Sequence, residues 1–394
     1  MKESLFNYRF EYENQKYIFN TNNNGLIQIN NDIFTEEERE YLRVNRFWVD
    51  DNEDEIALLE REINHNIQKR QKELELTIAL TNYCNFSCVY CYQNKNEKLM
   101  TTEVANMIIE KIDRILNDNI FEGINIHYFG GEPLLNIPVL IYLDENIKKI
   151  TDKIGIVYKA FLTTNGSMLS KELLQKVKFS SIQLTFDGLE KTHDRLRVSD
   201  HFHFKEEIEL IENIMNFSQA KVLLRTNICK ENKDEIIALH KYIFEKFGNE
   251  RIEINPNRTI KYHQDDSFEM LSVQEYAEVA YQIKLLWSEQ KGKFELPVPR
   301  STPCEFPYGN AYAISPEGYC TFCSGSMDQE KKYFFDVDIE NKKMFSVRKE
   351  CKKCNILPLC LGGCIIQYNL RAGACTYEKY ELKNILISYI KHIS

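Results

Sequence analysis

The sequence predicts an α/β fold, with a partial (β/α)6 barrel of the TIM type between a small N-terminal α+β unit and a C-terminal cysteine-rich domain. From Leu74 onward, apolar strand-like runs recur at intervals of roughly 30 to 35 residues, with an amphipathic helical pattern in each gap. Eight of the twelve cysteines fall between Cys304 and Cys375, where this rhythm has stopped. The expected domain boundaries are 1–72, 73–296 and 297–394.

The N-terminal unit is expected to form a small antiparallel meander followed by helices. Short alternating stretches at 8–12, 17–19 and 26–29 are separated by turn-forming residues. Thr35 and Glu38 have the spacing of a helix capping box, a further strand is expected at 47–49, and apolar residues recur at helical spacing between Ile56 and Ile67. Such a unit is too small to be an enzyme by itself.

The middle of the chain is expected to alternate six strands with helices. Apolar positions recur at helical spacing from Val104 to Ile115 and from Ile236 to Phe247, and Ser272 and Glu275 form a second capping box. Six successive β-α units favour a parallel sheet, either open or curled into a partial barrel. The six strands are expected at 74–81, 124–129, 158–163, 182–186, 222–227 and 252–255.

Composition excludes several classes of protein. The chain has 394 residues, 43% of them hydrophobic, so it can bury a sizeable core. Its net charge of -9 argues against a general nucleic-acid binder, which needs an excess of Lys and Arg to displace counterions. No apolar run approaches the roughly 18 residues that a bilayer span requires, and the first residues lack the apolar stretch of a signal peptide. We therefore expect a cytoplasmic protein with no nucleic-acid or membrane partner.

The cysteines indicate metal ligation or catalysis, because a reducing compartment disfavours disulfides. Cys84, Cys88 and Cys91 are close in sequence, whereas Cys229 is isolated and is expected in the core. Structural zinc usually takes four ligands, while a four-iron cluster held by three thiolates keeps one iron open for another ligand. A zinc loop remains the alternative at this point.

Residues 84–91 resemble the CxxxCxΦC motif of radical S-adenosylmethionine (SAM) enzymes, including the aromatic Tyr90 before the last cysteine. Three further segments, each after a successive expected strand, are similar to motifs of the same family. The first is Gly130-Gly131-Glu132-Pro133, which is similar to the family's GGEP segment, and the second is Thr164-Asn165, which resembles the family's segment at the ribose of SAM. The third contains Thr185 and Asp187 and resembles the SxDG motif, with Thr in place of Ser. Arg197 follows Thr185 by twelve positions, where relatives place an arginine for SAM.

The family resemblance implies how these residues would act. Backbone groups and Glu132 would contact the methionyl ammonium of SAM, and its amino and carboxylate groups would bind the open iron of a [4Fe-4S] cluster. Electron transfer into the sulfonium would then give methionine and a 5′-deoxyadenosyl radical that takes a hydrogen atom from the substrate. All four segments are expected at the carboxyl ends of strands, where β/α barrels build active sites.

The C-terminal cysteines resemble the seven-cysteine pattern of the SPASM domain, which binds two auxiliary [4Fe-4S] clusters in relatives. The resemblance implies that one cluster would be held by Cys351, Cys354, Cys360 and Cys375. The other would be held by Cys304, Cys323 and Cys364. A pair of zinc ribbons is the alternative. Cys320 is either an eighth ligand or a buried inert thiol, since it would face the other side of a regular strand from Cys323.

The resemblance implies a peptide or protein substrate. Sulfatase-maturing relatives carry an aspartate after the position of Cys323, whereas this chain has Ser324. The N-terminal unit is similar, in element order, to the leader-peptide recognition unit of peptide maturases, and its strands could pair with an extended peptide. We expect a maturase that installs a cross-link or related change in a precursor peptide, with a flavodoxin or ferredoxin-type electron donor. The alternatives are a sulfatase-maturing or small-molecule enzyme, and a non-enzymatic metal scaffold.

Overall fold

The computed structural model describes residues 1–29, 34–118, 121–248, 251–261, 267–308, 310–321, 323–326, 332–337, 344–364 and 375–393. The chain forms two compact units. One contains Met1–Lys69, Ser272–Cys304 and Lys343–Ser394, and the other contains Arg70–Leu271 and Glu305–Lys342. Each unit thus consists of segments that are not adjacent in the sequence. The division into domains at 1–72, 73–296 and 297–394 stays a prediction.

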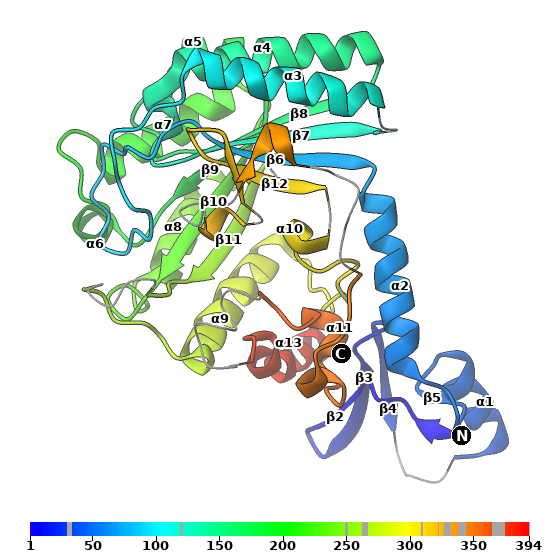
Figure 1. The fold of residues 1–394 in the computed structure, drawn as a ribbon. Coiled ribbons are helices and arrows are strands. Elements are labelled where there is room, and N and C mark those ends of the chain that lie inside the picture. Colours follow the sequence, from blue (N-terminus) through cyan, green and yellow to red (C-terminus); the bar gives the residue numbers. More distant parts are fainter. Residues whose placement is uncertain are drawn as a thin grey trace. The chain divides into compact units, whose positions relative to one another are not determined.

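The second unit is built on a parallel sheet whose first six strands follow one another in both sequence and space (Figure 1). Each expected strand is present, and every neighbouring pair is parallel. The sheet ends in different strands at its two edges and is therefore open rather than a closed barrel. The six strands are β6 (Glu73–Ala79), β7 (Gly123–Phe129), β8 (Val157–Thr163), β9 (Phe179–Thr185), β10 (Lys221–Ile228) and β11 (Ile252–Arg258).

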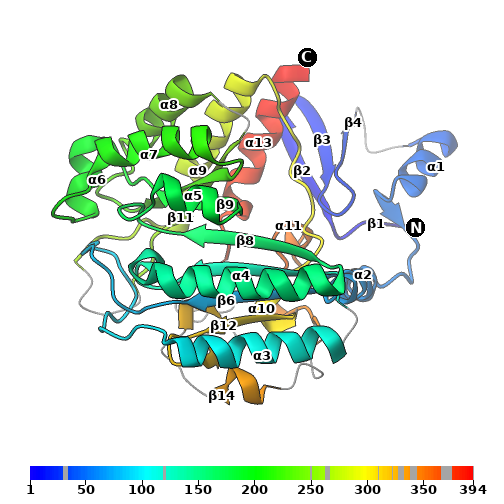
Figure 2. The same cartoon turned by 90° about the horizontal axis from the view of Figure 1, so that it is seen from above.

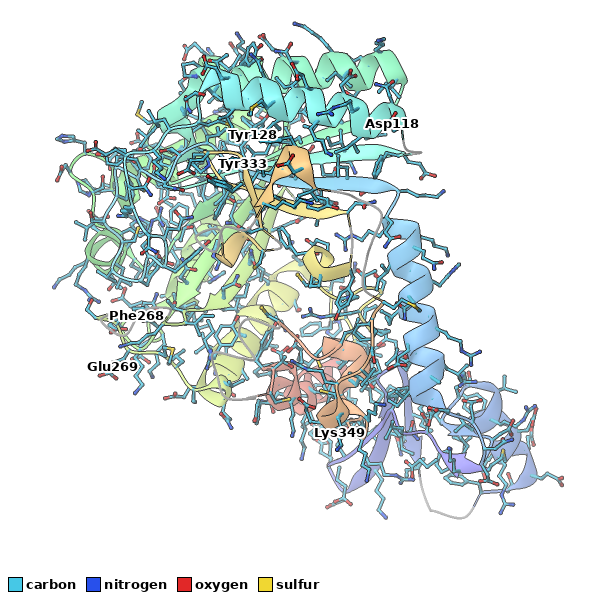
Figure 3. All side chains as sticks on the ribbon, viewed as in Figure 1. Asp118, Tyr128, Phe268, Glu269, Tyr333 and Lys349 are labelled. Atoms are coloured by element: carbon cyan, nitrogen blue, oxygen red, sulfur yellow. The ribbon has the colours of Figure 1, made fainter. Side chains whose placement is uncertain are left out.

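Helices connect these strands and lie along one face of the sheet (Figure 2). They are α3 (Thr102–Asp118), η1 (Pro133–Asn136), α4 (Ile137–Ile154), α5 (Lys171–Lys176), α6 (Glu190–Leu196), α7 (Phe204–Phe217) and α8 (Ile236–Phe247). The helix-covered face is apolar: on β7, Ile124, Ile126 and Tyr128 are fully buried (Figure 3). Among the described residues, none of the helices combines the length and the apolarity that crossing a bilayer would require.

Three strands from the cysteine-rich region extend the same sheet, which the sequence pattern did not predict. β12 (Ala311–Ile314) pairs in parallel with β6, and β13 (Tyr319–Thr321) and β14 (Lys332–Tyr333) follow in antiparallel order. All four residues of β12 are buried. The remaining short elements of this unit are α10 (Glu305–Tyr308), η2 (Ser324–Ser326) and η3 (Phe334–Asp336).

The first unit contains the expected meander. Its strands β2 (Asn7–Tyr12), β3 (Gln15–Asn20) and β4 (Gly25–Ile29) pair in antiparallel order, and positive φ angles at Glu13 and Asn14 make the tight turn between β2 and β3. Thr35 and Glu38 form the expected capping box. The other elements near this sheet are β1 (Lys2–Glu3), α1 (Glu36–Val44), β5 (Trp48–Val49), which pairs with β1, and α2 (Glu55–Arg70).

Two helices from distant parts of the chain complete the first unit. α9 (Val273–Lys291) begins at the expected Ser272 capping box, and α13 (Glu378–Ile393) packs against it. Leu382, Leu386 and Ile390 of α13 also pack on the aromatic side chains of β2 and β3. Two short elements, η4 (Lys349–Cys351) and α11 (Leu357–Cys360), lie in the same unit.

His240 on α8 makes the stability of the second unit depend on pH. It is fully buried, and burial lowers its pKa from 6.5 to about 3. The unfolded chain therefore takes up a proton at His240 below about pH 6.5, whereas the native chain does not until about pH 3. The contribution of His240 to the free energy of unfolding is therefore fully present above pH 6.5. It declines as the pH falls from 6.5 to 3, by up to about 1.4 kcal/mol per pH unit.

We expect His240→Gln to reduce this slope, measured as the urea midpoint between pH 7 and pH 5 by circular dichroism under anaerobic conditions. The substitution will also lower stability at pH 7, so the slope and not the midpoint is the readout. An unchanged slope would show that His240 is not kept neutral by burial.

Candidate active site

Four loops meet at the carboxyl ends of β6, β7, β8 and β9. Because parallel strands end at the same edge of a sheet, the segments at Cys84, Gly130, Thr164 and Asp187 become neighbours although they are far apart in sequence. Hydrogen bonds given below join each of these loops to at least one other. The structure thus brings together the residues that the sequence placed after four successive strands.

Two glycines allow the first two loops to touch. The N–H groups of Gly131 and Glu132 donate to the carbonyls of Thr81 (2.8 Å) and Tyr83 (2.9 Å). Gly130 has a φ of +136°, and a Cβ there would lie 2.3 Å from the Thr81 carbonyl oxygen; a Cβ on Gly131 would lie 2.1 Å from that of Tyr83. Any side chain at Gly131 would therefore push the cysteine loop away.

The carboxylate of Glu132 ties the second loop to the third. It is fully buried and accepts hydrogen bonds from the N–H of Leu134 (2.9 Å), the hydroxyl of Thr164 (2.7 Å) and the N–H of Asn165 (2.6 Å). Burial raises its pKa, and these donors oppose that rise. A carboxylate has about four acceptor positions, so one stays available for the ammonium group that the family resemblance implies.

Asn165 joins the third loop back to the cysteines. Its side-chain amide donates to Oδ1 of Asn85 (2.8 Å) and lies 3.8 Å from Sγ of Cys84. The N–H of Phe86 donates to the same sulfur (3.4 Å). Burial raises the pKa of Cys84, and the hydrogen bond from the Phe86 N–H opposes this rise and favours the thiolate, the form that binds metal.

The three cysteines share one partly buried loop. Burial raises the pKa of Cys88 to about 11, Arg197 opposes this rise, and Cys91 and Cys84 contribute to it. Among the described residues, no three His, Cys, Asp or Glu side chains converge on a single ion. A cluster does not require such convergence, because each thiolate binds a different iron.

Tyr90, Asp187 and Arg197 form a buried group beside the cysteines. The Tyr90 hydroxyl donates to one oxygen of Asp187, and the N–H of Asn227 donates to the other (2.7 Å). Nη1 of Arg197 lies 3.5 Å from the Tyr90 hydroxyl, while its Nε is buried with no partner among the described residues. A buried guanidinium with an unused N–H fits an anionic group such as the carboxylate of SAM.

The remaining predicted positions have structural roles in these loops. Pro133 begins η1, and the buried Thr185 ends β9. Sequence analysis missed Asn232, whose amide donates to the backbone carbonyls of Asp187 (2.9 Å) and Asn227 (2.8 Å). No motif marked it, because one of these partners, the Asp187 carbonyl, lies in a loop that is distant in sequence. Cys229 is fully buried, as expected.

The sheet face opposite the helices is polar and hollowed. A cavity of about 390 Å³ is lined by Thr77, His127, Thr163 and Gln183, together with Glu305 and Ser324. Hydrogen bonds run across the strands from His127 to Thr163 (2.7 Å), then to Gln183 (3.3 Å) and on to Asn255 (3.2 Å). Burial lowers the pKa of His127 to about 4, so its ring is neutral at neutral pH. This face can bind polar groups of a substrate.

The C-terminal cysteines are spread over both units. In the first unit, Cys354 lies near Cys351 and Cys360, since it raises the pKa of each. The N–H of Gly362 donates to the Cys360 sulfur (3.4 Å). Cys304 and Cys364 are exposed, and Cys323 and Cys375 are half-buried. The predicted ligand sets of the two auxiliary clusters stay predictions.

Cys320 lies in β13 with its side chain in the interior. It is 5% exposed, and burial raises its pKa to about 12. Burial raises the pKa of Cys88 and Cys360 in the same way, so this shift does not separate a ligand from an inert thiol. Ligation by Cys320 also stays a prediction.

Residues 78–243 match the family model of the Radical SAM superfamily. The chain therefore carries a radical SAM domain, as the motifs predicted. The cyclopropyl synthase TigE of Paramaledivibacter caminithermalis, itself named a radical SAM protein, is 24% identical over 372 residues, which cover 83% of this chain and 76% of TigE.

Other relatives match over shorter regions. An uncharacterised protein of Methanocaldococcus jannaschii is 34% identical over 119 residues, and GTP 3′,8-cyclase of Helicobacter pylori is 31% identical over 186 residues. These regions cover 29% and 45% of this chain, and they span only 39% and 53% of the two relatives.

Two solved structures share the fold. anSMEcpe with bound AdoMet and the Cp18Cys peptide has a TM-score of 0.63 and 18% identity, over 82% of this chain and 98% of that one. SuiB of Streptococcus suis bound to the precursor peptide SuiA has a TM-score of 0.55 and 16% identity, over 93% and 96%. The predicted α/β fold, with a parallel sheet that does not close and a cysteine-rich region after it in the sequence, is confirmed.

The contact between the first two loops yields a test. We expect Gly131→Ala to lower the thermal unfolding midpoint by several degrees and to reduce the iron that the protein binds after anaerobic reconstitution, because the new methyl group would meet the Tyr83 carbonyl. The control is Gly292→Ala, where a Cβ would meet nothing within 4 Å but the φ of +61° strains the backbone, so this variant can lose stability and should keep its iron. Equal iron content in the two variants would contradict the close approach.

Proposed function

We propose that this radical SAM protein is a maturase that abstracts a hydrogen atom from a ribosomally made peptide and installs a cross-link or related modification. The observation that carries the proposal is the group of buried contacts that joins the cysteine loop to Glu132, Asn165 and Arg197 at one edge of an open sheet. This arrangement fits an iron-sulfur cluster and SAM side by side. The polar cavity on the same sheet supplies room for a substrate.

Each loop has a distinct task in this proposal. Cys84, Cys88 and Cys91 would hold a [4Fe-4S] cluster, and the free acceptor position of Glu132 and the unused N–H of Arg197 would hold the ammonium and carboxylate of SAM. When bound, the cluster and SAM together supply the 5′-deoxyadenosyl radical. The protein's own contribution is to fix these groups in a buried setting that excludes water.

Two features support a peptide substrate. The structures of similar fold include SuiB, bound to a precursor peptide, and anSMEcpe, bound to the Cp18Cys peptide. The first unit also offers β2 and β4, which are the edge strands of the described three-stranded sheet. An extended peptide can add to such an edge through backbone hydrogen bonds. We assign leader recognition to residues 1–72 on this basis.

The remaining partners are also proposals. Cys351, Cys354, Cys360 and Cys375, and separately Cys304, Cys323 and Cys364, would hold two auxiliary [4Fe-4S] clusters, with or without Cys320. An external flavodoxin or ferredoxin-type protein would supply the electron. We further propose that the enzyme works in the cytoplasm.

The alternative is a formylglycine-forming sulfatase maturase, and the likeness to anSMEcpe favours it. Ser324, at the position where such enzymes are expected to carry an aspartate, lines the polar cavity and is not a base. We therefore rank the alternative second. Conversion of a cysteine or serine to formylglycine in a sulfatase peptide would reverse this order.

The decisive experiment combines anaerobically reconstituted protein, SAM, a strong reductant and, where a short reading frame lies beside the gene, the peptide that it encodes, followed by mass spectrometry. We expect 5′-deoxyadenosine and a peptide that has lost hydrogen atoms, and fragmentation would locate the new bond. If 5′-deoxyadenosine forms and the peptide mass is unchanged, a mass-neutral epimerisation is tested next by chiral amino-acid analysis. An unmodified peptide in both assays would overturn the peptide assignment.

We expect replacement of Cys84, Cys88 and Cys91 by Ala to abolish 5′-deoxyadenosine formation and to leave the auxiliary irons, roughly eight of about twelve per chain if all three clusters are present. Cys229→Ala removes another buried cysteine and should preserve the product. Continued product formation by the triple variant would disprove the cluster assignment.

A further inference from the structure

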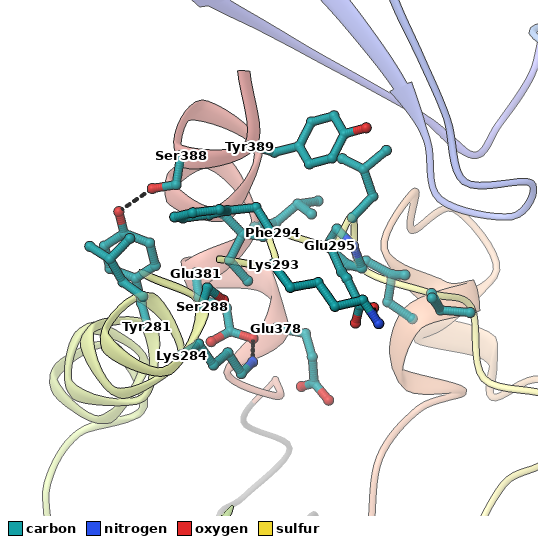
Figure 4. Close-up of a pocket in the computed structure, with 17 residues that line it drawn as sticks. Tyr281, Lys284, Ser288, Lys293, Phe294, Glu295, Glu378, Glu381, Ser388 and Tyr389 are labelled. Carbon is teal, nitrogen blue, oxygen red and sulfur yellow. Dashed lines mark hydrogen bonds and ion pairs between the residues drawn. The ribbon is translucent and has the colours of Figure 1, made fainter. Parts of the chain in front are cut away.

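A second cavity, of about 400 Å³, lies in the first unit between α9, α13 and residues 293–298 (Figure 4). None of its lining residues belongs to the radical SAM motifs or to the cysteines. Its lining includes the apolar side chains of Leu285, Phe294, Leu382 and Ile385. These side chains suit the hydrocarbon part of a ligand.

Two carboxylates from the first turn of α13 also line the cavity. The side chains of Glu378 and Glu381 are only 12% and 3% exposed. Each uses one oxygen in an ion pair: Glu381 with Lys284 (2.5 Å, Figure 4) and Glu378 with Arg300 (2.8 Å). The second oxygen of each carboxylate is buried and has no hydrogen-bond partner among the described residues.

The other polar groups of the cavity do not donate hydrogen bonds to these two oxygens. Tyr281 and Ser388 bond to each other at 2.6 Å. Lys293 and Glu295 form a pair that is 73% and 66% exposed and therefore contributes little. Lys284 and Arg300 are also 40% and 46% exposed, so the positive charges are nearer to water than the carboxylates are. The buried side of the cavity thus presents two unfilled acceptors one helical turn apart.

A buried carboxylate oxygen without a hydrogen-bond donor costs free energy, so the favoured ligand is one that supplies such donors. An anion would be repelled, and an apolar group would leave both oxygens unpaired. A guanidinium or ammonium group on an apolar stem supplies several N–H donors to the carboxylates, and its stem can pack against the apolar side chains of the cavity. The chain's net charge of -9 also attracts basic segments.

We propose that this cavity binds a basic side chain, arginine or lysine, of the peptide substrate. That the side chain comes from a peptide substrate rests on the proposed function, whereas the preference for a basic group rests on the cavity alone. The cavity would serve as an anchoring site separate from the radical chemistry.

The test uses the full-length reconstituted protein without SAM or reductant. The probe is acetyl-Ala-Leu-Arg-Leu-Ala-amide, and the control probe has citrulline in place of arginine, which keeps the shape and removes the charge. We expect calorimetry to give at least tenfold weaker binding of the citrulline peptide. Equal binding of the two peptides, or binding of neither, would overturn the proposal. Tighter binding of agmatine than of the arginine peptide would overturn its assignment to a peptide.

Three variants place the binding in this cavity. Glu381→Gln removes the buried charge and should weaken the arginine peptide at least fivefold. Ser288→Trp keeps both carboxylates and fills the space between the helices, so it should block binding even if Glu381→Gln fails to fold. Glu278→Gln changes an exposed carboxylate of α9 that does not line the cavity and should leave binding unchanged. Wild-type affinity in Ser288→Trp would exclude the cavity.

Failure of this site and failure of the proposed function give different results. Binding of the probes requires no turnover, and 5′-deoxyadenosine formation requires no occupied cavity. A protein that binds arginine peptides and does not modify a precursor would keep the site and lose the function.

Discussion

The structure of the candidate active site depends on one buried carboxylate. Glu132 is fully enclosed, and an isolated charge there would be very costly. It is tolerated because three donors from two loops converge on it. The same contacts fix Asn165, whose amide lies beside the Cys84 sulfur. Removing the carboxylate would release the third loop from the second and, through Asn165, disturb the cysteine loop.

Much of this arrangement could be predicted from the sequence. The six parallel strands follow from apolar runs at regular spacing, and four motifs at their carboxyl ends had to meet because the strands are parallel and adjacent. The capping boxes at Thr35 and Ser272 are local patterns, and they could be predicted equally well. Gly130 and Gly131 were expected at the site, and the structure adds the reason: neighbouring carbonyls leave no room for a Cβ.

Other parts could not be predicted, since their cause is non-local. Asn232 joins the carbonyl of Asp187, which is distant in sequence, to that of Asn227 at the end of its own strand, and no motif in its segment marks that role. Glu378 and Glu381 look like ordinary acidic residues at the start of a surface helix until α9 buries them. β12 is only four residues long, and only its pairing with β6 identifies it as a strand of the sheet. Boundaries drawn along the sequence could not anticipate units assembled from separate stretches.

The pairing of β12 with β6 has a consequence for biosynthesis. β6 is the first strand of the sheet to leave the ribosome, yet one of its edges is covered by a strand that follows β7 to β11 in the chain. Until residues 311–314 have been made, that edge displays unpaired backbone groups beside a very apolar face. Such long-range pairing slows folding and leaves a chain open to aggregation. The nascent chain therefore keeps one edge of its first strand exposed until β12 docks.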